Sequence, residues 1–415
     1  MTSSVLDWAE AMWTGAVTAD HSTILTGGMG TPLIEVAPGV GFLANFANVI
    51  AVDGGEGLAL IDTGSFLTGA RVRDEVARWR AAPVVAAVYT HGHVDHATGM
   101  TPFDDAAVAA GRPRPRVYAH EAVAARFDRY RLTAGWNTAI NQRQFRVPGL
   151  AWPTEYRYPD VTYRGHWKLA VGEVKVELHH ALGETDDHTW AWLPAERVLC
   201  TGDLFIWAAP NCGNPQKVQR YVREWADALD AMRALAPAVL LPGHGPPIVG
   251  ADRVAQALAE TASLLRTLHD QTVAAMNQGL TLDEVVAEVV VPAELLARPY
   301  LRPVYDDPAF IIRNVWRRYG GWWDGNPARL LPPRDHAVGR EVAALAGGAT
   351  ALAARAEAVA DDDLALACQL IEWAAAAAPA DAGVVAARAR VYRRRAEAAS
   401  SLMARSIFTA ASERR

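Results

Sequence analysis

The segment Thr90-His91-Gly92-His93-Val94-Asp95-His96 brings three imidazoles and a carboxylate together within six residues. Imidazole nitrogens and carboxylate oxygens are the usual protein ligands of zinc. The segment follows a valine-rich run of strand type at residues 83–90, so we expect a loop at a strand end. Alternation along this loop points His91 and His93 the same way, while Asp95 and His96 turn toward a neighbouring position. The spacing therefore predicts two metal positions close together, with a solvated polar loop as the alternative.

Short β-rich runs alternate with helical patterns and glycine-containing turns between residues 40 and 250. Several runs are rich in valine and leucine and end in a polar residue, as buried strands of a layered sheet do. The expected strands are residues 46–53, 57–64, 83–90, 116–120, 174–180, 189–193, 197–203 and 238–244, and the expected helices are residues 65–80 and 218–235. Strands interleaved with helices predict an α/β sandwich whose strand-end loops carry the chemistry.

The pattern becomes helical in the second part of the chain, where strand signals almost disappear. Helical segments are expected at residues 252–276, from the capping box 281–284 onward, and in the alanine-rich stretches 350–378 and 381–411. The alanine-rich hairpins resemble tetratricopeptide-like packing, but they are fewer than the roughly three units that a free-standing array needs. We therefore predict a catalytic domain over residues 1–250 and a helical domain over residues 251–415, which packs on the first domain or on another subunit.

The composition indicates a soluble globular protein that binds neither nucleic acid nor membrane, and the expected partner is a small-molecule substrate. The formal charge of −6 provides no basic field for nucleic acid or an anionic membrane. The three cysteines, Cys200, Cys212 and Cys368, lack paired spacing, which is typical of a reducing compartment. The N-terminal segment has no basic stretch followed by an apolar run, so we expect no signal peptide. No stretch approaches the ~18 apolar residues of a membrane span, and we expect a cytoplasmic location.

The histidine-rich segment matches the metal-binding motif of the metallo-β-lactamase superfamily, and further residues follow in that superfamily's order. Asp203 ends an expected strand at the position of the metal-bridging carboxylate. His244 lies at the position of the last histidine ligand. Asp62 lies where the superfamily keeps a carboxylate that orients the ligands from behind, although a turn-forming aspartate is an equal alternative. The resemblance implies an αββα metallo-β-lactamase sandwich with two divalent metals, which we expect to be zinc.

One ligand position departs from the superfamily's pattern, because Glu184 occupies the slot of its third histidine. The implied ligands are His91, His93, Glu184 and Asp203 for the first metal and Asp95, His96, Asp203 and His244 for the second. Three carboxylates over two ions are expected to leave the site less cationic than the all-histidine version. Nearby His179, His180 and His188 compete for the slot, and we expect them to be structural, with His188 lying behind the ligands.

A glutamate in this slot is a feature of the alkylsulfatase branch of the superfamily. The second domain independently resembles the dimerisation domain of those enzymes, through residues 296–332, 346–379 and the final helix. The tryptophan-rich run Tyr319-Gly320-Gly321-Trp322-Trp323-Asp324-Gly325-Asn326-Pro327 carries the most specific part of this match. Together the two resemblances cover roughly residues 40–412. We expect the sterol-carrier-like C-terminal domain of the longer relatives to be absent, which leaves a preference for long alkyl tails open.

The segments 133–145 and 210–225 follow elements that border the expected metal cleft. They supply candidate substrate-binding side chains, namely Asn137, Asn141, Arg143, Lys217, Arg220 and Arg223, of which a guanidinium is a natural clamp for paired sulfate or carboxylate oxygens. Tryptophans 136, 190, 192 and 207 are candidates for an apolar pocket wall, with core packing as the alternative.

The resemblance implies a dinuclear zinc hydrolase that cleaves an alkyl sulfate to alcohol and sulfate with metal-bound hydroxide. Asp203 and Asp95 would be its catalytic carboxylates. A carboxylic ester, lactone, phosphodiester or aryl ether is the alternative substrate for the same site. An alternative of another class is a non-catalytic assembly subunit that pairs with a related chain. We expect residues 251–412 to form a subunit interface, giving a homodimer or higher oligomer, with a hetero-oligomer as the alternative.

Overall fold

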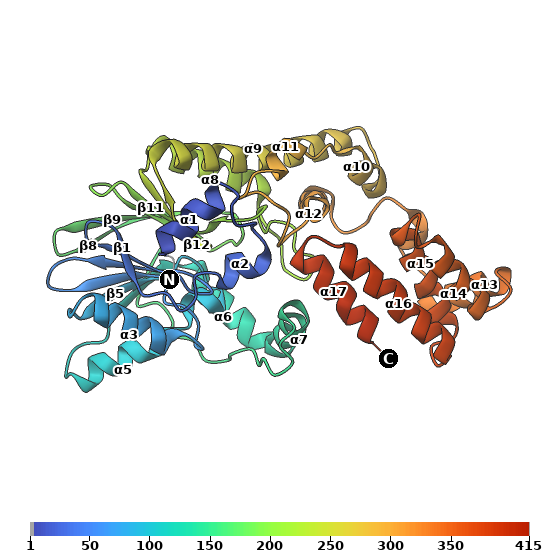
Figure 1. Cartoon of the computed structure of the whole chain (residues 1–415), viewed down its shortest axis with the longest axis horizontal. Helices are drawn as coiled ribbons and strands as arrows, with labels where there is room; N and C mark the ends of the chain where they lie inside the picture. The colour runs from blue at the N-terminus through green and yellow to red at the C-terminus, as the bar shows by residue number, and fades with distance from the viewer. Residues whose placement is uncertain (1–3, 415) are drawn as a thin grey trace.

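The computed structural model describes residues 4–414, so the first three residues and the last one of the predicted domain ranges lie outside the described residues. Two sheets face each other in the first part of the chain (Figure 1). The first sheet runs in chain order through β1 Ile34–Ala37, β2 Val40–Leu43, β3 Val49–Asp53, β4 Leu58–Ile61, β5 Val84–Val88, β6 Arg116–His120 and β7 Val161–Tyr163. The second has the order β13 Ile248–Val249, β12 Val239–His244, β11 Val198–Ile206, β10 Thr189–Leu193, β9 Val174–His180 and β8 His166–Val171.

Every second residue along the strands faces the other sheet, and these apolar side chains bury the inner faces of the two sheets against each other. Phe42, Ile61 and Leu178 belong to this shared core and are at most 1% exposed. Both outer faces are covered as well, which makes four layers. On the first sheet lie α3 Gly69–Trp79, α4 Val94–Ala97, α5 Thr101–Ala109 and α6 Ala122–Leu132, and on the second lie α8 Val222–Ala234 and α9 Ala251–Asn277. Helix α7 Ala134–Phe145 follows α6 and packs against the last helix of the chain. The N-terminal helices are α1 Val5–Trp13 and α2 His21–Thr26.

The part of the chain after α9 consists of helices and loops, with no strand among its described residues. Its helices are α10 Leu282–Glu288, α11 Ala293–Leu296, α12 Pro308–Gly320, the 3-10 turn Pro327–Arg329, α13 Asp335–Leu345, α14 Ala349–Val359, α15 Leu364–Ala377, α16 Ala382–Ala398 and α17 Leu402–Glu413. Helices α13 to α16 surround their own alanine-rich core and lie to one side of the sandwich (Figure 1). The predicted fold, an αββα sandwich followed by an all-helical region, is confirmed.

Helices α9 and α17 connect the two regions. Helix α9 buries Leu258 and Leu265 in the same core as Trp225 of α8, so it packs as part of the sandwich. At the other end, α17 returns to α7, where the Ser406 hydroxyl donates to the Gln144 carbonyl at 2.7 Å. The boundary at residue 250 stays a prediction, because the helical region's separate core first gathers near residue 343.

Within residues 4–414, no single helix is long and apolar enough to cross a membrane. The pair α13 and α14 reaches that apolarity only together and bends by 85° at its break. Both helices bury apolar residues, including Ala343 of α13 and Leu352 of α14, in the core that they share with α15 and α16.

Candidate metal centre

The sandwich brings all the proposed ligands together at one end of its sheets. Buried His91 follows β5, and α4 begins immediately after half-buried His93, so that Asp95 and His96 lie on its first turn. The second sheet supplies Glu184 from the loop between β9 and β10, Asp203 from β11 and His244 from the end of β12. Strands β11 and β12 are parallel neighbours. They approach so closely at this point that a Cβ atom at Gly243 would lie 2.1 Å from the Asp203 carboxylate, and only glycine fits there.

The first group consists of His91, His93, Glu184 and Asp203. His91 Nε2 lies 2.8 Å from His93 Nδ1 and 4.0 Å from the Glu184 carboxylate. His93 Nδ1 lies 3.9 Å from the same carboxylate oxygen, and His91 Nε2 lies 3.8 Å from Asp203 Oδ2. All four donor atoms therefore face one small volume.

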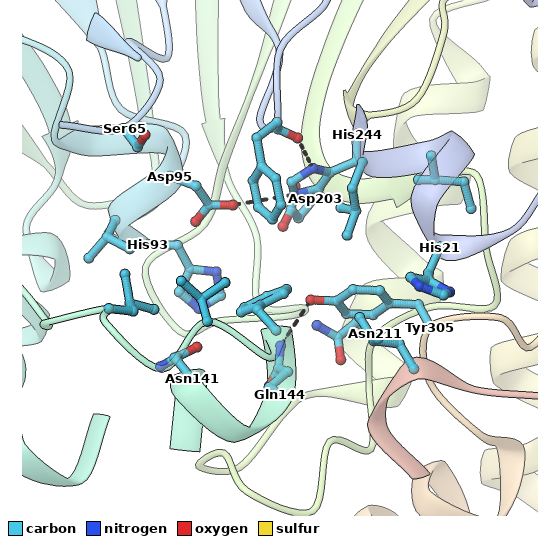
Figure 2. A pocket seen from close by; sticks show the side chains of 18 of the residues that line it. His21, Ser65, His93, Asp95, Asn141, Gln144, Asp203, Asn211, His244 and Tyr305 are labelled. Atoms are coloured by element: carbon cyan, nitrogen blue, oxygen red, sulfur yellow. Dashed lines mark hydrogen bonds and ion pairs between the residues drawn. The ribbon is translucent and has the colours of Figure 1, made fainter. Parts of the chain in front are cut away.

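The second group consists of Asp95, His96 and His244. His244 Nε2 lies 3.6 Å from Asp95 Oδ2, and His96 Nε2 lies 3.7 Å from the same oxygen. The other oxygen of Asp203, Oδ1, lies 3.2 Å from His96 and 3.4 Å from His244. Asp203 thus presents one oxygen to each group, and Figure 2 shows it beside His244, opposite His93 and Asp95.

The chemistry of these side chains fits a pair of divalent metals. His96 Nε2, Glu184 Oε2 and Asp203 Oδ1 are buried and make no hydrogen bond, an arrangement that costs free energy unless another partner is supplied. Burial and the neighbouring histidines hold the pKa of His91 well below its ordinary value, so its imidazole is neutral and free to bind a metal. Burial opposes ionisation of Asp203, yet His244 and His96 keep its pKa well below the usual range.

Asp62 contacts the second group from behind, and its role as a supporting carboxylate stays a prediction. Its Oδ2 lies 2.7 Å from His96 Nδ1 and accepts from the Thr90 hydroxyl at 2.8 Å, while Oδ1 accepts from the Thr90 backbone. Asp62 has a φ of 60°, a left-handed conformation that aspartate tolerates better than most residues. These contacts fix the ring so that Nε2 points to the metal position. On the same side, His244 Nδ1 is held by the Phe46 carbonyl.

A buried ion pair orients the first group in a similar way. Arg126 of α6 is 3% exposed and donates to Asp187 at 2.6 Å and to Asp186. The same Asp187 oxygen accepts from the backbone N–H of Gly92, between the two histidines, at 3.0 Å. The Arg126 pair therefore links the loop that carries His91 to the loop that carries Glu184. No sequence motif marks this arginine.

Glu184 lies in the predicted slot, with its Oε2 toward the histidines and its Oε1 bound by Arg220 and Asn211. Arg220 is 2% exposed, so its positive charge offsets the additional carboxylate. The expectation of a less cationic site omitted this compensating charge. Burial raises the pKa of Glu184 to about 8, an effect that Arg220 opposes.

The neighbouring histidines do not contribute to either group. His188 stacks on the His91 ring at 4.6 Å, and its Nε2 lies 3.2 Å from the Thr201 carbonyl. Burial lowers the pKa of His188 to about 4. His180 binds the His188 carbonyl and stacks on His120, while His179 lies on the outer face against Trp190.

A cavity of about 750 Å³ opens above the two groups. Its polar floor includes Asp95, Asp203 and His244 (Figure 2). Apolar side chains from several elements form its walls, including Ile24, Leu25, Phe46, Phe145, Val147, Leu150, Trp152, Ile206 and Leu402. Leu402 comes from α17, so the helical region closes part of the cavity.

The predicted substrate-binding residues divide into two sets. Asn141, Lys217 and Arg220 line the cavity. Asn137 and Arg143 do not belong to its lining, and the Asn137 amide donates to Thr133, which immediately precedes its helix.

Several other expectations about this cavity need correction. Arg223, a candidate for substrate binding, does not line the cavity. It forms ion pairs with Asp227 of α8 and Asp270 of α9. For Trp190, Trp192 and Trp207 the alternative of core packing holds, because they belong to the core beneath α8 and α9, whereas Trp136 is 61% exposed. The structure adds Trp152, Asn211 and Tyr305, whose hydroxyl accepts from Gln144 at 3.2 Å (Figure 2). Tyr305 lies in the segment before α12, far along the chain from the metal motif, and only the fold brings it here.

Comparisons with known proteins agree with this arrangement. The family described as Metallo-beta-lactamase superfamily matches residues 43–244, and the family described as Alkyl sulfatase dimerisation matches residues 281–415. A linear primary-alkylsulfatase from Pseudomonas sp. is 30% identical over 72% of this chain and 60% of its own length. An (R)-specific secondary-alkylsulfatase from Pseudomonas sp. is 31% identical over 74% of this chain and 50% of its own.

The solved structure of the stereoselective inverting sec-alkylsulfatase Pisa1 from Pseudomonas sp. superposes with a TM-score of 0.81 and 29% identity. It covers 91% of this chain, which in turn covers 64% of that structure. The chain thus spans only about half to two-thirds of the length of these relatives. With both family regions matched in the same order, residues 43–244 form a domain of the metallo-β-lactamase superfamily, and the chain as a whole resembles the alkylsulfatase branch of that superfamily.

Proposed function

We propose that this chain is a dinuclear zinc hydrolase that cleaves an alkyl sulfate ester to an alcohol and sulfate. The metallo-β-lactamase fold and the alkylsulfatase relatives support a metal-dependent hydrolase. The two donor groups that share Asp203 support two metals, and their mixture of imidazoles and carboxylates suits zinc. The proposed ligands are His91, His93, Glu184, Asp203, Asp95, His96 and His244.

The observation that carries the substrate proposal is the division of the cavity into an apolar and a cationic part. Its walls contribute aliphatic and aromatic side chains, whereas Lys217 and Arg220 lie near the polar floor. The Lys217 ammonium lies 3.4 Å from the Asn141 side-chain oxygen and faces the Trp152 ring at 5.6 Å. An amphiphilic anion places its charged end and its hydrocarbon tail in matching surroundings there.

The chain's own residues would bind and orient the ester. Lys217 and Asn141 would hold sulfate oxygens above the floor, while Phe145, Leu150 and Leu402 remove the alkyl chain from water. Arg220 would act mainly through Glu184, because it binds that carboxylate. When bound, the two metals would lower the pKa of a water molecule and would supply positive charge that stabilises developing oxyanions. Sulfate is a weakly basic leaving group, so cleavage of the carbon–oxygen bond requires little help from a general acid.

A substrate screen combined with elemental analysis tests this proposal. The purified chain is assayed with primary and secondary alkyl sulfates, carboxylic esters and aryl ethers, and released sulfate is measured separately. We expect about two zinc ions per chain and sulfate release that is lost on chelation. Hydrolysis of esters or ethers without turnover of any alkyl sulfate would reject the substrate, and full activity with one metal or none would reject the dinuclear centre.

We further propose a cytoplasmic homodimer formed through the helical region. The matched dimerisation family supports oligomerisation, and Trp322, Leu331 and Leu345 are 72%, 90% and 90% exposed on that region. Sedimentation at micromolar concentration should give twice the chain mass, whereas a monomer would contradict the proposed homodimer.

Cell fractionation tests the proposed cytoplasmic location, and activity confined to a membrane or extracellular fraction would contradict that location.

A further inference from the structure

A second group of metal-binding side chains lies on the hairpin formed by β8 and β9. His166 and His179 are direct partners across the two strands, and their rings are 4.6 Å apart. Glu177 lies two residues before His179, so both side chains project from the same face of β9. Donor atoms of His166, Glu177 and His179 all lie within 4.8 Å of one another. None of these residues belongs to the groups around Asp203.

The position of His179 is already fixed. Its ring stacks on Trp190 at 4.1 Å with an angle of 11°, and the Nε2 atom is buried without a hydrogen-bond partner. Nε2 lies 3.7 Å from the Glu177 carboxylate, a spacing that one ion between them would satisfy. Burial and the neighbouring His166 lower the pKa of His179, which keeps the imidazole neutral at neutral pH.

We propose that His166, Glu177 and His179 form an additional binding site for a divalent transition metal such as zinc, separate from the catalytic centre. Two imidazoles and one carboxylate select zinc, nickel or copper over magnesium and calcium, which prefer oxygen ligands. Three protein ligands on one face leave a coordination position open to solvent. The site would therefore bind more weakly than a closed structural site with four ligands.

Lys168 competes with such an ion. Its ammonium lies 3.7 Å from Glu177 Oε1, although its side chain is 74% exposed and free to move away. The proposed site therefore predicts opposite effects for two neighbouring substitutions on β8: removal of His166 weakens metal binding, and removal of Lys168 strengthens it.

Equilibrium dialysis of the metal-loaded enzyme against buffered zinc tests the site. The wild-type chain should bind one zinc ion beyond those in the catalytic centre, with micromolar affinity. His166→Ala should weaken that additional binding by roughly tenfold or more, since one of three ligands is lost. Lys168→Ala should strengthen it, and hydrolytic activity should be unchanged in both variants.

His336→Ala serves as the matched control, because His336 is an exposed histidine of α13 away from the hairpin. It should bind zinc as the wild type does. Absence of an additional zinc ion in the wild type, or equal binding by wild type and His166→Ala, would overturn the proposal. The comparison depends on the difference between variants, so it remains decisive even if the catalytic centre holds another number of metals.

Discussion

The two halves of the candidate metal centre are supported by opposite charges. In the first half the Arg220 guanidinium lies behind the Glu184 carboxylate, whereas in the second half the Asp62 carboxylate lies behind the His96 imidazole. Arg220 favours the ionised form of Glu184, whereas Asp62 holds the Nδ1 side of the His96 ring so that Nε2 faces Asp203. A carboxylate can thus occupy a histidine slot because a buried cation accompanies it. Asp203 presents one carboxylate oxygen to each half, and each of the other six proposed ligands belongs to one half, so substitutions outside Asp203 can test the halves separately.

The largest effect is expected at the shared residue. Asp203→Ala should remove a ligand from both halves, so metal content and activity fall together. The loss should exceed the roughly 10–100-fold that follows from removal of a supporting partner. Elemental analysis and kcat/KM on the same preparation measure it, and a variant with near wild-type values would show that Asp203 does not bridge the halves.

The Glu184 slot provides the next test, confined to the first half. Glu184→Ala should empty or weaken one metal position and leave the second occupied, since Asp95, His96 and His244 are intact. His188→Ala should keep both metals and reduce activity by no more than about 10–100-fold, because His188 packs behind His91. The opposite ranking of the two variants would place the ligand four residues further along this loop.

Conservative changes in the supporting groups should separate the halves more finely. Asp62→Asn removes the charge behind His96 and should weaken the second position, whereas Arg126→Lys disturbs the contact with Asp187 and should weaken the first. Each should cost roughly 10–100-fold in metal affinity or rate. Metal titrations with thermal unfolding as a folding control distinguish the two. Identical titration curves would mean that the halves fill as one unit.

The smallest effect concerns the pH dependence of substrate binding by Lys217, whose ammonium lies near the first half of the centre. Burial, together with the Arg220 charge, lowers the pKa of Lys217 from 10.5 to about 8. The cation is therefore lost as pH rises through 8, and KM for an anionic substrate should increase by about tenfold per pH unit above it. Lys217→Arg stays charged and should flatten this rise, whereas exposed Lys175→Arg should behave as wild type.

The lowered pKa of Lys217 affects stability in the opposite direction from substrate binding, because stability should increase as the pH rises. Between pH 8 and 10.5 the unfolded chain holds one proton more than the folded chain at Lys217. The contribution of Lys217 to the free energy of unfolding therefore increases with pH in this range. Stability of the wild type relative to Lys217→Arg should rise across the same window, and a fall would show that Lys217 keeps its proton.

Local patterns were sufficient for the strands and motifs with strong periodicity or dense chemistry. The predicted strand 189–193 is β10, the run 238–244 contains β12, and the motif at residues 91–96 lies at a strand end. The short strands β1 and β2 were missed, because four residues carry too little alternation to be distinguished from a loop.

The sequence by itself also determined the residue types of the metal centre and their order along the chain, because metal ligands are recognisable by chemistry and spacing. Only the tertiary structure decided which charges accompany them. Arg126, Arg220 and Tyr305 reach the site from separate elements, and arginine or tyrosine at such spacing is ordinary in any sequence. Their roles come from burial beside particular partners, and burial depends on long-range packing that no local pattern encodes.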